Sequence, residues 1–177
     1  MTLFGLDIKI ETIIAPPISG LPAIVCHHSL QAALVTASDY PSPSVIENLK
    51  ENVERFRDSS NEREINVVPY NWSEPVTELL SLNHGRKYDI VMCAECLWHH
   101  DSHNILAQSI MDVLRVGGHL LMSFSHHIPG LESNDLAFFA ILERNNFSIV
   151  GKHTYDSVHM WSDRAVEIYV YELERKE

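Results

Sequence analysis

The stretch Ser38–Leu49, which reads SDYPSPSVIENL, decides the fold of this chain. It follows the apolar run Ala32–Ala37 with an acidic residue, Asp39, and then directly with a helix start. A short uncharged run of this kind is typical of a buried strand, so the segment predicts a strand that passes into a helix. A glycine, Gly20, opens the segment GLPAIVC upstream.

Gly20 and Asp39 together indicate nucleotide binding. In a doubly wound α/β fold, the last glycine of a strand–helix turn and an acid about 20 residues later hold the ribose of an adenosine group. The carboxylate accepts hydrogen bonds from ribose hydroxyls, and the glycine lets the backbone approach the ligand. Asp39 alternatively caps the next turn, as acids at strand–helix junctions often do.

Strand-like and helix-like segments alternate along the whole chain. We expect strands at 8–14, 32–37, 65–70, 88–94, 119–125, 147–155 and 165–173, and helices at 21–30, 44–56, 73–82, 103–115 and 136–145. This alternation predicts an α/β, Rossmann-like, doubly wound and mostly parallel seven-stranded sheet. The last two strands are joined by residues 156–164, which are too few for a crossover helix, so they should form an antiparallel hairpin.

Two helix ends are predicted from single residues. Ser73 is a good cap for the helix at 73–82, because a serine side chain can accept a hydrogen bond from the first helical turn. Gly117-Gly118 should stop the helix at 103–115 and turn the chain into the strand that follows.

Length and charge restrict the class of protein. A chain of 177 residues predicts a single domain, 1–177. The formal charge of −11 argues against nucleic acid as the main partner and is compatible with a basic protein partner. The N-terminus lacks a signal-peptide pattern, and no apolar run nears the length of a membrane span, so we expect a cytoplasmic protein.

The cysteines and histidines do not indicate a metal site. Cys26, Cys93 and Cys96 lie in apolar runs, where reduced cysteine behaves as a small hydrophobe. The pair Cys93 and Cys96 lacks the second pair that a zinc site needs. Histidines gather at 99–103 and 126–127 without a defined ligand set, so we predict no metal.

Several motifs extend the pattern along the chain. They are GLPAIVC at 20–26, SDYPSP at 38–43, VVPYNW at 67–72, YDIV at 88–91, HDSH at 100–103, SHHIP at 125–129 and DLAFF at 135–139. With these motifs the chain resembles the class I, seven-β-strand S-adenosylmethionine-dependent methyltransferases. Within that class it resembles the lysine-methyltransferase-like, or nicotinamide N-methyltransferase-like, branch, whose fungal members methylate the N-terminal region of translation elongation factor 1-alpha.

The resemblance implies S-adenosyl-L-methionine as cofactor, elongation factor 1-alpha as protein substrate, and a monomeric enzyme. It implies cofactor-binding roles for Gly20, Asp39, Tyr40, Trp72, Ala94 and Glu95. Glu95, His126 and His127 are the candidates for the catalytic role of holding the amine, since His126 and His127 follow a strand at its ligand-facing end. Asp39 would bind the ribose and Trp72 the adenine face. Plain packing remains an alternative for Trp72 and a solvated strand end for Glu95.

The resemblance also predicts an altered N-terminal segment at residues 1–19. Relatives carry a glycine-rich cofactor loop there, whereas this chain has Pro16-Pro17, and proline offers no backbone N–H. The sequence therefore leaves two functions open. One is a protein N-methyltransferase, and the alternative is a catalytically impaired or non-catalytic methyltransferase-like binding module.

Overall fold

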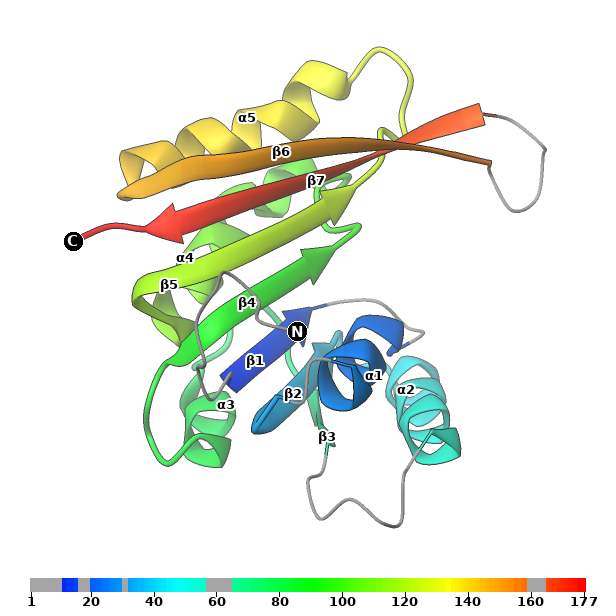
Figure 1. Ribbon diagram of the computed structural model, residues 1–177, viewed down its shortest axis with the longest axis vertical. Helices are drawn as coiled ribbons and strands as arrows, with labels where there is room; N and C mark the ends of the chain where they lie inside the picture. The colour runs from blue at the N-terminus through cyan, green and yellow to red at the C-terminus, as the bar shows by residue number, and fades with distance from the viewer. Residues whose placement is uncertain (1–10, 16–19, 30–31, 57–64, 159–164) are drawn as a thin grey trace.

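The structure is a computed structural model, and it describes residues 11–15, 20–29, 32–56, 65–158 and 165–177. These residues form one twisted sheet with helices on both faces (Figure 1). The strands are β1 (Glu11–Ala15), β2 (Leu34–Asp39), β3 (Ile65–Pro69), β4 (Tyr88–Ala94), β5 (Leu114–Phe124), β6 (Phe147–Val158) and β7 (Ala165–Arg175).

The strand order is β3-β2-β1-β4-β5-β7-β6. Strand β1 pairs in parallel with β2 and with β4, so the order of the strands reverses around β1. Strand β7 is antiparallel to both β5 and β6. The prediction of a mostly parallel, doubly wound sheet closed by an antiparallel hairpin is therefore confirmed.

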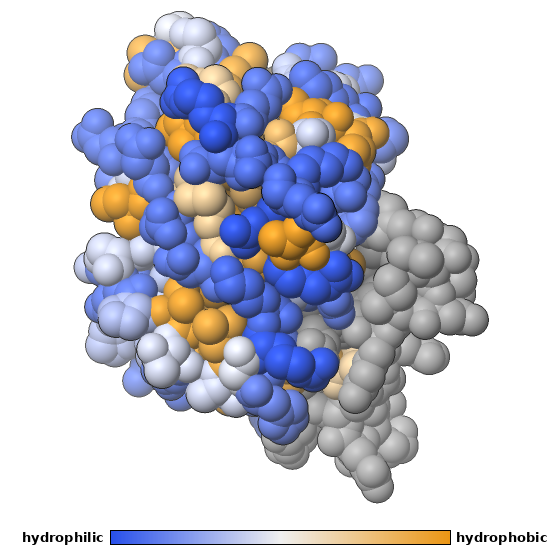
Figure 2. Space-filling model, turned by 90° about the vertical axis from the view of Figure 1, so that its left-hand side faces the viewer, coloured by the Kyte–Doolittle hydropathy of each residue, from blue (hydrophilic) through white to orange (hydrophobic). Residues whose placement is uncertain are grey.

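The helices lie in two layers. They are α1 (Leu21–His28), α2 (Pro43–Arg55), α3 (Thr77–Leu82), the 3-10 helix η2 (His100–Ser102), α4 (His103–Val113) and α5 (Glu132–Arg144). Helices α1 and α2 cover one face of the sheet near β2 and β3, and α4 and α5 cover the opposite face near β5, β6 and β7 (Figure 1). The side of the molecule drawn in Figure 2 is mostly hydrophilic, with apolar side chains scattered between the polar ones.

Two hydrophobic clusters fill the space between sheet and helices. The larger contains Leu79 of α3, Leu106 of α4 and Phe138 of α5, and the smaller contains Ala23 of α1 and Leu49 of α2. Each face of the sheet therefore has its own core, as a parallel sheet covered on both sides requires.

Tyr88 connects the two halves of this core. It is fully buried, and its hydroxyl lies 2.9 Å from Thr36 Oγ1 and donates to the carbonyl oxygen of Leu79 at 2.8 Å. Since a buried hydroxyl is stable only when it is hydrogen-bonded, this contact satisfies Tyr88 and links β4 to β2 and α3.

Several predicted boundaries are wrong. Helix α3 begins at Thr77 instead of Ser73, because Pro75 disfavours helical geometry in the residue before it. Ser73 does not cap the helix, and its Oγ accepts a hydrogen bond from Asn71 instead. Helix α5 begins at Glu132, earlier than the predicted Leu136, and the acids Glu132 and Asp135 in its first turn suit a helix N-terminus.

The largest correction concerns Gly117-Gly118. Helix α4 ends at Val113, and the glycines lie inside strand β5, which begins at Leu114. Leu114 pairs with Tyr88, and the register between β4 and β5 shifts directly after this pair. A side chain at Gly118 would come within 2.9 Å of the carbonyl oxygens of Arg115 and Asp89, so glycine permits close backbone approach at this irregularity.

The ends of the chain differ less from the prediction. Helix α1 ends at His28, and β6 and β7 extend to Val158 and Arg175. Strand β1 spans Glu11–Ala15 where 8–14 was expected, and Pro16-Pro17 lies outside the described residues.

Candidate active site

A cleft of about 490 Å³ opens at the carboxyl ends of the central strands. Its described lining residues come from the ends of β2 and β4, from the loop after β3 and from the segment before α4. They are Ser38, Asp39, Tyr40, Tyr70, Asn71, Trp72, Glu95, Cys96, Trp98, His99 and Ser102. Open α/β sheets bind ligands at this edge, where the strand order reverses, and the volume suits a small molecule of roughly 300–1,000 Å³ site size.

Asp39 ends β2 and presents a buried carboxylate to the cleft. It is 8% exposed, and its Oδ1 accepts a hydrogen bond from the backbone N–H of Tyr40 at 2.7 Å. Its Oδ2 has no hydrogen-bond partner among the described residues. Burial raises the pKa of the Asp39 carboxyl, and the Tyr40 N–H counteracts this only in part. The contact with the Tyr40 N–H therefore uses one carboxylate oxygen, and the other oxygen retains its capacity to accept a hydrogen bond.

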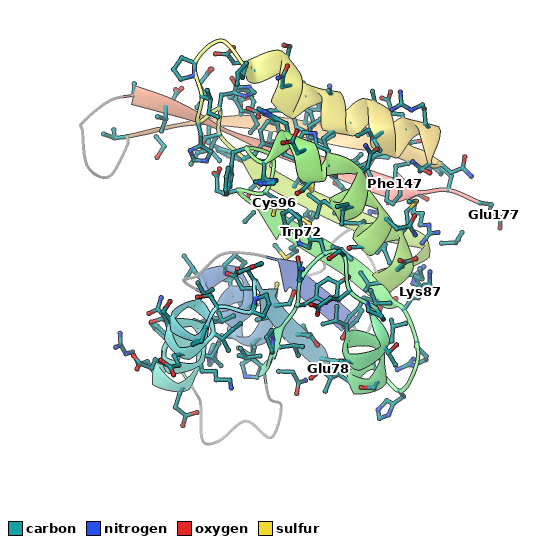
Figure 3. The ribbon with its side chains drawn as sticks, turned by 180° about the vertical axis from the view of Figure 1, so that it is seen from behind. Trp72, Glu78, Lys87, Cys96, Phe147 and Glu177 are labelled. Carbon is teal, nitrogen blue, oxygen red and sulfur yellow. The ribbon has the colours of Figure 1, made fainter. Side chains whose placement is uncertain are left out.

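The loop after β3 is fixed by a chain of hydrogen bonds. The backbone N–H of Tyr70 donates to the carbonyl oxygen of Asp39 at 2.8 Å, which joins the ends of β3 and β2. The Tyr70 hydroxyl lies 3.1 Å from Ser109 Oγ, and Ser109 donates to the carbonyl oxygen of Trp72. These bonds hold Trp72 against the larger core cluster while its side chain lines the cleft beside Cys96 (Figure 3).

Glu95 has a backbone conformation that non-glycine residues rarely adopt. Its φ is 54°, and its backbone N–H donates to the carbonyl oxygen of Ser123 at 2.8 Å. A residue held in this left-handed region costs about 1–2 kcal/mol, and such strain gathers at functional sites. The observation favours a site role for Glu95 over that of a solvated strand end.

The Glu95 carboxylate collects donors from the turn after β5. It accepts hydrogen bonds from the backbone N–H of Ser125 at 3.2 Å and from the Ser125 hydroxyl, and its Oε2 lies 2.7 Å from His127 Nε2. The Glu95 and His127 side chains are 42% and 49% exposed, so both are accessible from solvent. A carboxylate paired with an imidazole can orient an amine and accept its proton.

The structure brings only part of the predicted set into the cleft. Asp39, Tyr40, Trp72 and Glu95 line it, whereas Gly20, Ala94, His126 and His127 are not among its described lining residues. Ala94 directly precedes Glu95 and pairs with Ser123 of β5, and His127 contacts the site through Glu95.

Gly20 and His126 have contacts of other kinds. Gly20 precedes α1 with a φ of 68°, and a side chain there would come within 2.9 Å of Leu49 Cδ1. The His126 ring packs against Phe124 and Tyr169, and its Nδ1 lies 2.7 Å from Asp135 Oδ2.

Sequence reasoning did not assign several other residues around the site, among them Trp98, His99, Ser102 and Asp135. Trp98, His99 and Ser102 line the cleft, and Asp135 contacts His126. Trp98 stands out because it lines the cleft and is 52% exposed. Asp135 opens the DLAFF motif, and HDSH includes Ser102, so two of the quoted motifs already contained residues of this region.

Among the described residues, no group of three or more histidine, cysteine or acidic side chains is arranged to hold a metal ion. Cys93 and Cys96 are buried, and burial raises the pKa of the Cys96 thiol well above its usual value. Over the same ranges, no helix has the length and apolar character that crossing a membrane requires.

Two solved methyltransferase structures have the same fold as this chain. A methyltransferase from Pyrococcus furiosus superposes with a TM-score of 0.66 at 13% identity, covering 95% of this chain and 76% of that chain. The N-methyltransferase NodS from Bradyrhizobium japonicum gives 0.63 at 12% identity, covering 95% and 87%. The fold is therefore that of the Rossmann-like methyltransferases.

The sequence identifies the family within this fold. Residues 19–145 match the lysine methyltransferase family, and the chain belongs to it. It is 31% identical over 137 residues to the protein N-terminal and lysine N-methyltransferase EFM7 of Schizosaccharomyces pombe, covering 74% of this chain and 52% of that protein. The protein of the same name from Yarrowia lipolytica is 29% identical over 135 residues, covering 68% and 49%. The chain thus spans about half the length of these curated relatives.

Proposed function

We propose that this protein transfers a methyl group from S-adenosyl-L-methionine to an amine of a protein substrate. The observation that carries the proposal is the Asp39 carboxylate, which belongs to a residue lining the cleft and whose buried oxygen Oδ2 has no hydrogen-bond partner among the described residues. A buried carboxylate in this state is stabilised by a ligand that brings hydroxyl donors, and an adenosine ribose brings two.

The donor set of the cleft fits this cofactor. Asp39 would hold the ribose hydroxyls, Trp72 and Tyr40 offer aromatic faces for the adenine, and the Gly20 turn and Ala94 would border the methionine end. When bound, the cofactor supplies an electrophilic methyl group on a sulfonium. The protein's own part is to orient the incoming amine and to exclude competing water.

Glu95, His126 and His127 are proposed for the amine side of the reaction. The Glu95 carboxylate would orient the amine, and the Glu95–His127 pair at 2.7 Å would receive its proton. His126 would contribute through the turn that it shares with His127. Trp98, which is exposed and lines the same cleft as Glu95, would offer an apolar surface to the stem of a substrate side chain.

The proposed substrate is the amino-terminal and lysine-containing region of translation elongation factor 1-alpha. The names of the curated relatives support protein N-terminal and lysine methylation, and the formal charge of −11 suits a basic protein segment better than nucleic acid. We propose that the chain acts in the cytoplasm as a monomer and as one domain.

Two measurements test this function. Titration calorimetry of the chain with S-adenosyl-L-methionine should show binding that Asp39→Asn weakens by about ten- to a hundredfold, because two charge-assisted hydrogen bonds become neutral ones. Transfer of a labelled methyl group to elongation factor 1-alpha should then depend on Glu95. Absence of cofactor binding by the unchanged chain would instead support the non-catalytic binding module.

A further inference from the structure

Asp135 holds two histidines from different parts of the chain. It lies in the first turn of α5 and is only 3% exposed. Its Oδ1 lies 2.6 Å from His100 Nε2, and its Oδ2 lies 2.7 Å from His126 Nδ1. Both carboxylate oxygens are therefore used, and each contacts a different imidazole.

These contacts assign the hydrogen positions on both rings. An ionised carboxylate only accepts, so each facing ring nitrogen must carry a proton. In its neutral form His126 is then the Nδ1–H tautomer with Nε2 as acceptor, and His100 is the Nε2–H tautomer with Nδ1 as acceptor. Asp135 thereby fixes both the orientation and the tautomer of each ring.

His100 belongs to a segment that lines the cleft. His100 starts η2, directly after Trp98 and His99 and before Ser102, which all line the cleft. His103 strengthens this side, because its Nε2 lies 2.9 Å from the carbonyl oxygen of Leu97 and its ring meets that of His100 edge to face.

His126 belongs to the segment that contacts Glu95. It lies in the turn Ser125–His127, which supplies the donors to the Glu95 carboxylate. Its ring is further enclosed by Phe124 and Tyr169, and its side chain is 18% exposed. Asp135 consequently connects the wall made by Trp98 and His99 to the turn that carries His127.

We propose that Asp135 is a positioning residue, which clamps the His99–Ser102 segment to the Ser125–His127 turn and so keeps His127 paired with Glu95 at the substrate amine. The catalytic part of this inference rests on the function proposed above. The clamp itself rests only on the contacts of Asp135, and it can be tested without any substrate.

The substitution Asp135→Asn tests the clamp with little change in shape. An asparagine presents one acceptor oxygen and one amide donor, so it can satisfy only one of the two ring N–H groups. The other imidazole must move its proton to its second nitrogen or lose its contact. Glu172→Gln is the matched control, since Glu172 pairs with His119 at 3.0 Å between β7 and β5 and lines no described part of the cleft.

Nitrogen-15 NMR of the full chain at mildly alkaline pH reads the tautomers directly. We expect the unchanged protein to show His126 as the Nδ1–H form and His100 as the Nε2–H form. Asp135→Asn should convert one of them, and Glu172→Gln should leave both as they are. The clamp is refuted if the unchanged protein shows His126 in the Nε2–H form, a result that does not require any variant to fold.

Measurements of turnover and cofactor binding separate the positioning role of Asp135 from the proposed function. With Asp135→Asn, turnover on elongation factor 1-alpha should fall on the order of tenfold or more, whereas the cofactor dissociation constant should stay within about twofold. Turnover unchanged by Asp135→Asn despite a converted tautomer would overturn the positioning role. If the unchanged chain binds cofactor but methylates no protein, the proposed function fails, while the tautomer result still decides whether the clamp exists.

Discussion

The Glu95 carboxylate and the His127 imidazole meet at 2.7 Å, although the two residues belong to different strand ends. Glu95 follows β4 and His127 lies in the turn after β5. Parallel pairing of these strands, with Ala94 opposite Ser123, brings their carboxyl ends to the same edge of the sheet. The contact is thus a consequence of strand register, and the left-handed backbone at Glu95 turns its side chain toward the turn after β5.

Replacing Glu95 by glutamine should separate methyl transfer from cofactor binding. The amide keeps the size of the side chain and one acceptor for Ser125, but it removes the charge that holds the amine and accepts its proton. We expect turnover to fall roughly a hundredfold. Cofactor affinity, measured by calorimetry, should change little. Glu78→Gln on the exposed surface of α3 is the control, and an equal loss of turnover there would contradict the assignment.

Asp39→Asn should weaken cofactor binding but leave the stability of the folded protein unchanged or higher. Burial raises the pKa of the Asp39 carboxyl in the folded protein, so the ionised form is less favourable there than in the unfolded chain. The sign follows from linkage: the contribution of Asp39 to stability is fully present below pH 3.8 and is lost as the pH rises through the higher, folded pKa. At neutral pH the variant should therefore melt at the same or a higher temperature than the unchanged protein.

The same raised pKa predicts how cofactor affinity depends on pH. A protonated Asp39 carboxyl loses the charge that strengthens its hydrogen bonds to ribose hydroxyls. Affinity should fall as the pH drops toward and below the raised pKa, and the Asp39→Asn variant should lack this dependence. Calorimetry across an acidic pH series measures the cofactor affinity of both proteins. If the two affinities vary with pH in the same way, Asp39 does not bind the cofactor.

The parts of the fold that depend on local patterns were predictable from the sequence. The continuous apolar run Tyr88–Ala94 predicted β4 with the same bounds that the structure has. The short connection 156–164 correctly predicted the antiparallel hairpin of β6 and β7. Asp39, Trp72 and Glu95 were placed at strand ends by the same patterns, and they do line one cleft.

The parts set by tertiary packing were not predictable in this way. Leu114 and Arg115 continue the helical periodicity of α4, but Leu114 pairs with Tyr88 of β4 and therefore belongs to strand β5. Asp135 contacts His100, which is 35 positions away in the sequence, because α5 packs against η2 and α4. No local pattern specifies such a contact, since it depends on how an entire helix docks.

Gly118→Ala tests the irregular start of β5. An added methyl group would come within 2.7 Å of Leu114 Cδ1 and 2.9 Å of the carbonyl oxygens of Arg115 and Asp89, and those backbone atoms cannot move freely. We expect a loss of about 1–3 kcal/mol in the free energy of unfolding, measured with denaturant.

Gly85→Ala provides the comparison for Gly118. Gly85 has a φ of 77° but nothing within 4 Å of the added methyl group, so only backbone strain of about 1 kcal/mol remains. If Gly118→Ala is as stable as the unchanged protein, then β4 and β5 do not approach each other closely at this point.

His103 should make stability depend on pH near neutrality. Burial lowers the pKa of its imidazole below the usual 6.5, and the neutral ring contacts the carbonyl oxygen of Leu97 through Nε2. Because the pKa of His103 is lower in the folded protein, its contribution to stability is present above pH 6.5 and is lost as the pH falls through the folded value. The unfolded chain then binds the proton more readily than the folded protein does.

His103→Gln tests this dependence, because glutamine retains an N–H donor and does not titrate. Both proteins can be compared by chemical denaturation from pH 8 to pH 5, a range of about 3 units around the ordinary histidine pKa. The unchanged protein should lose more stability over this range than His103→Gln. The other histidines are common to both proteins, so equal losses would show that His103 does not control this dependence.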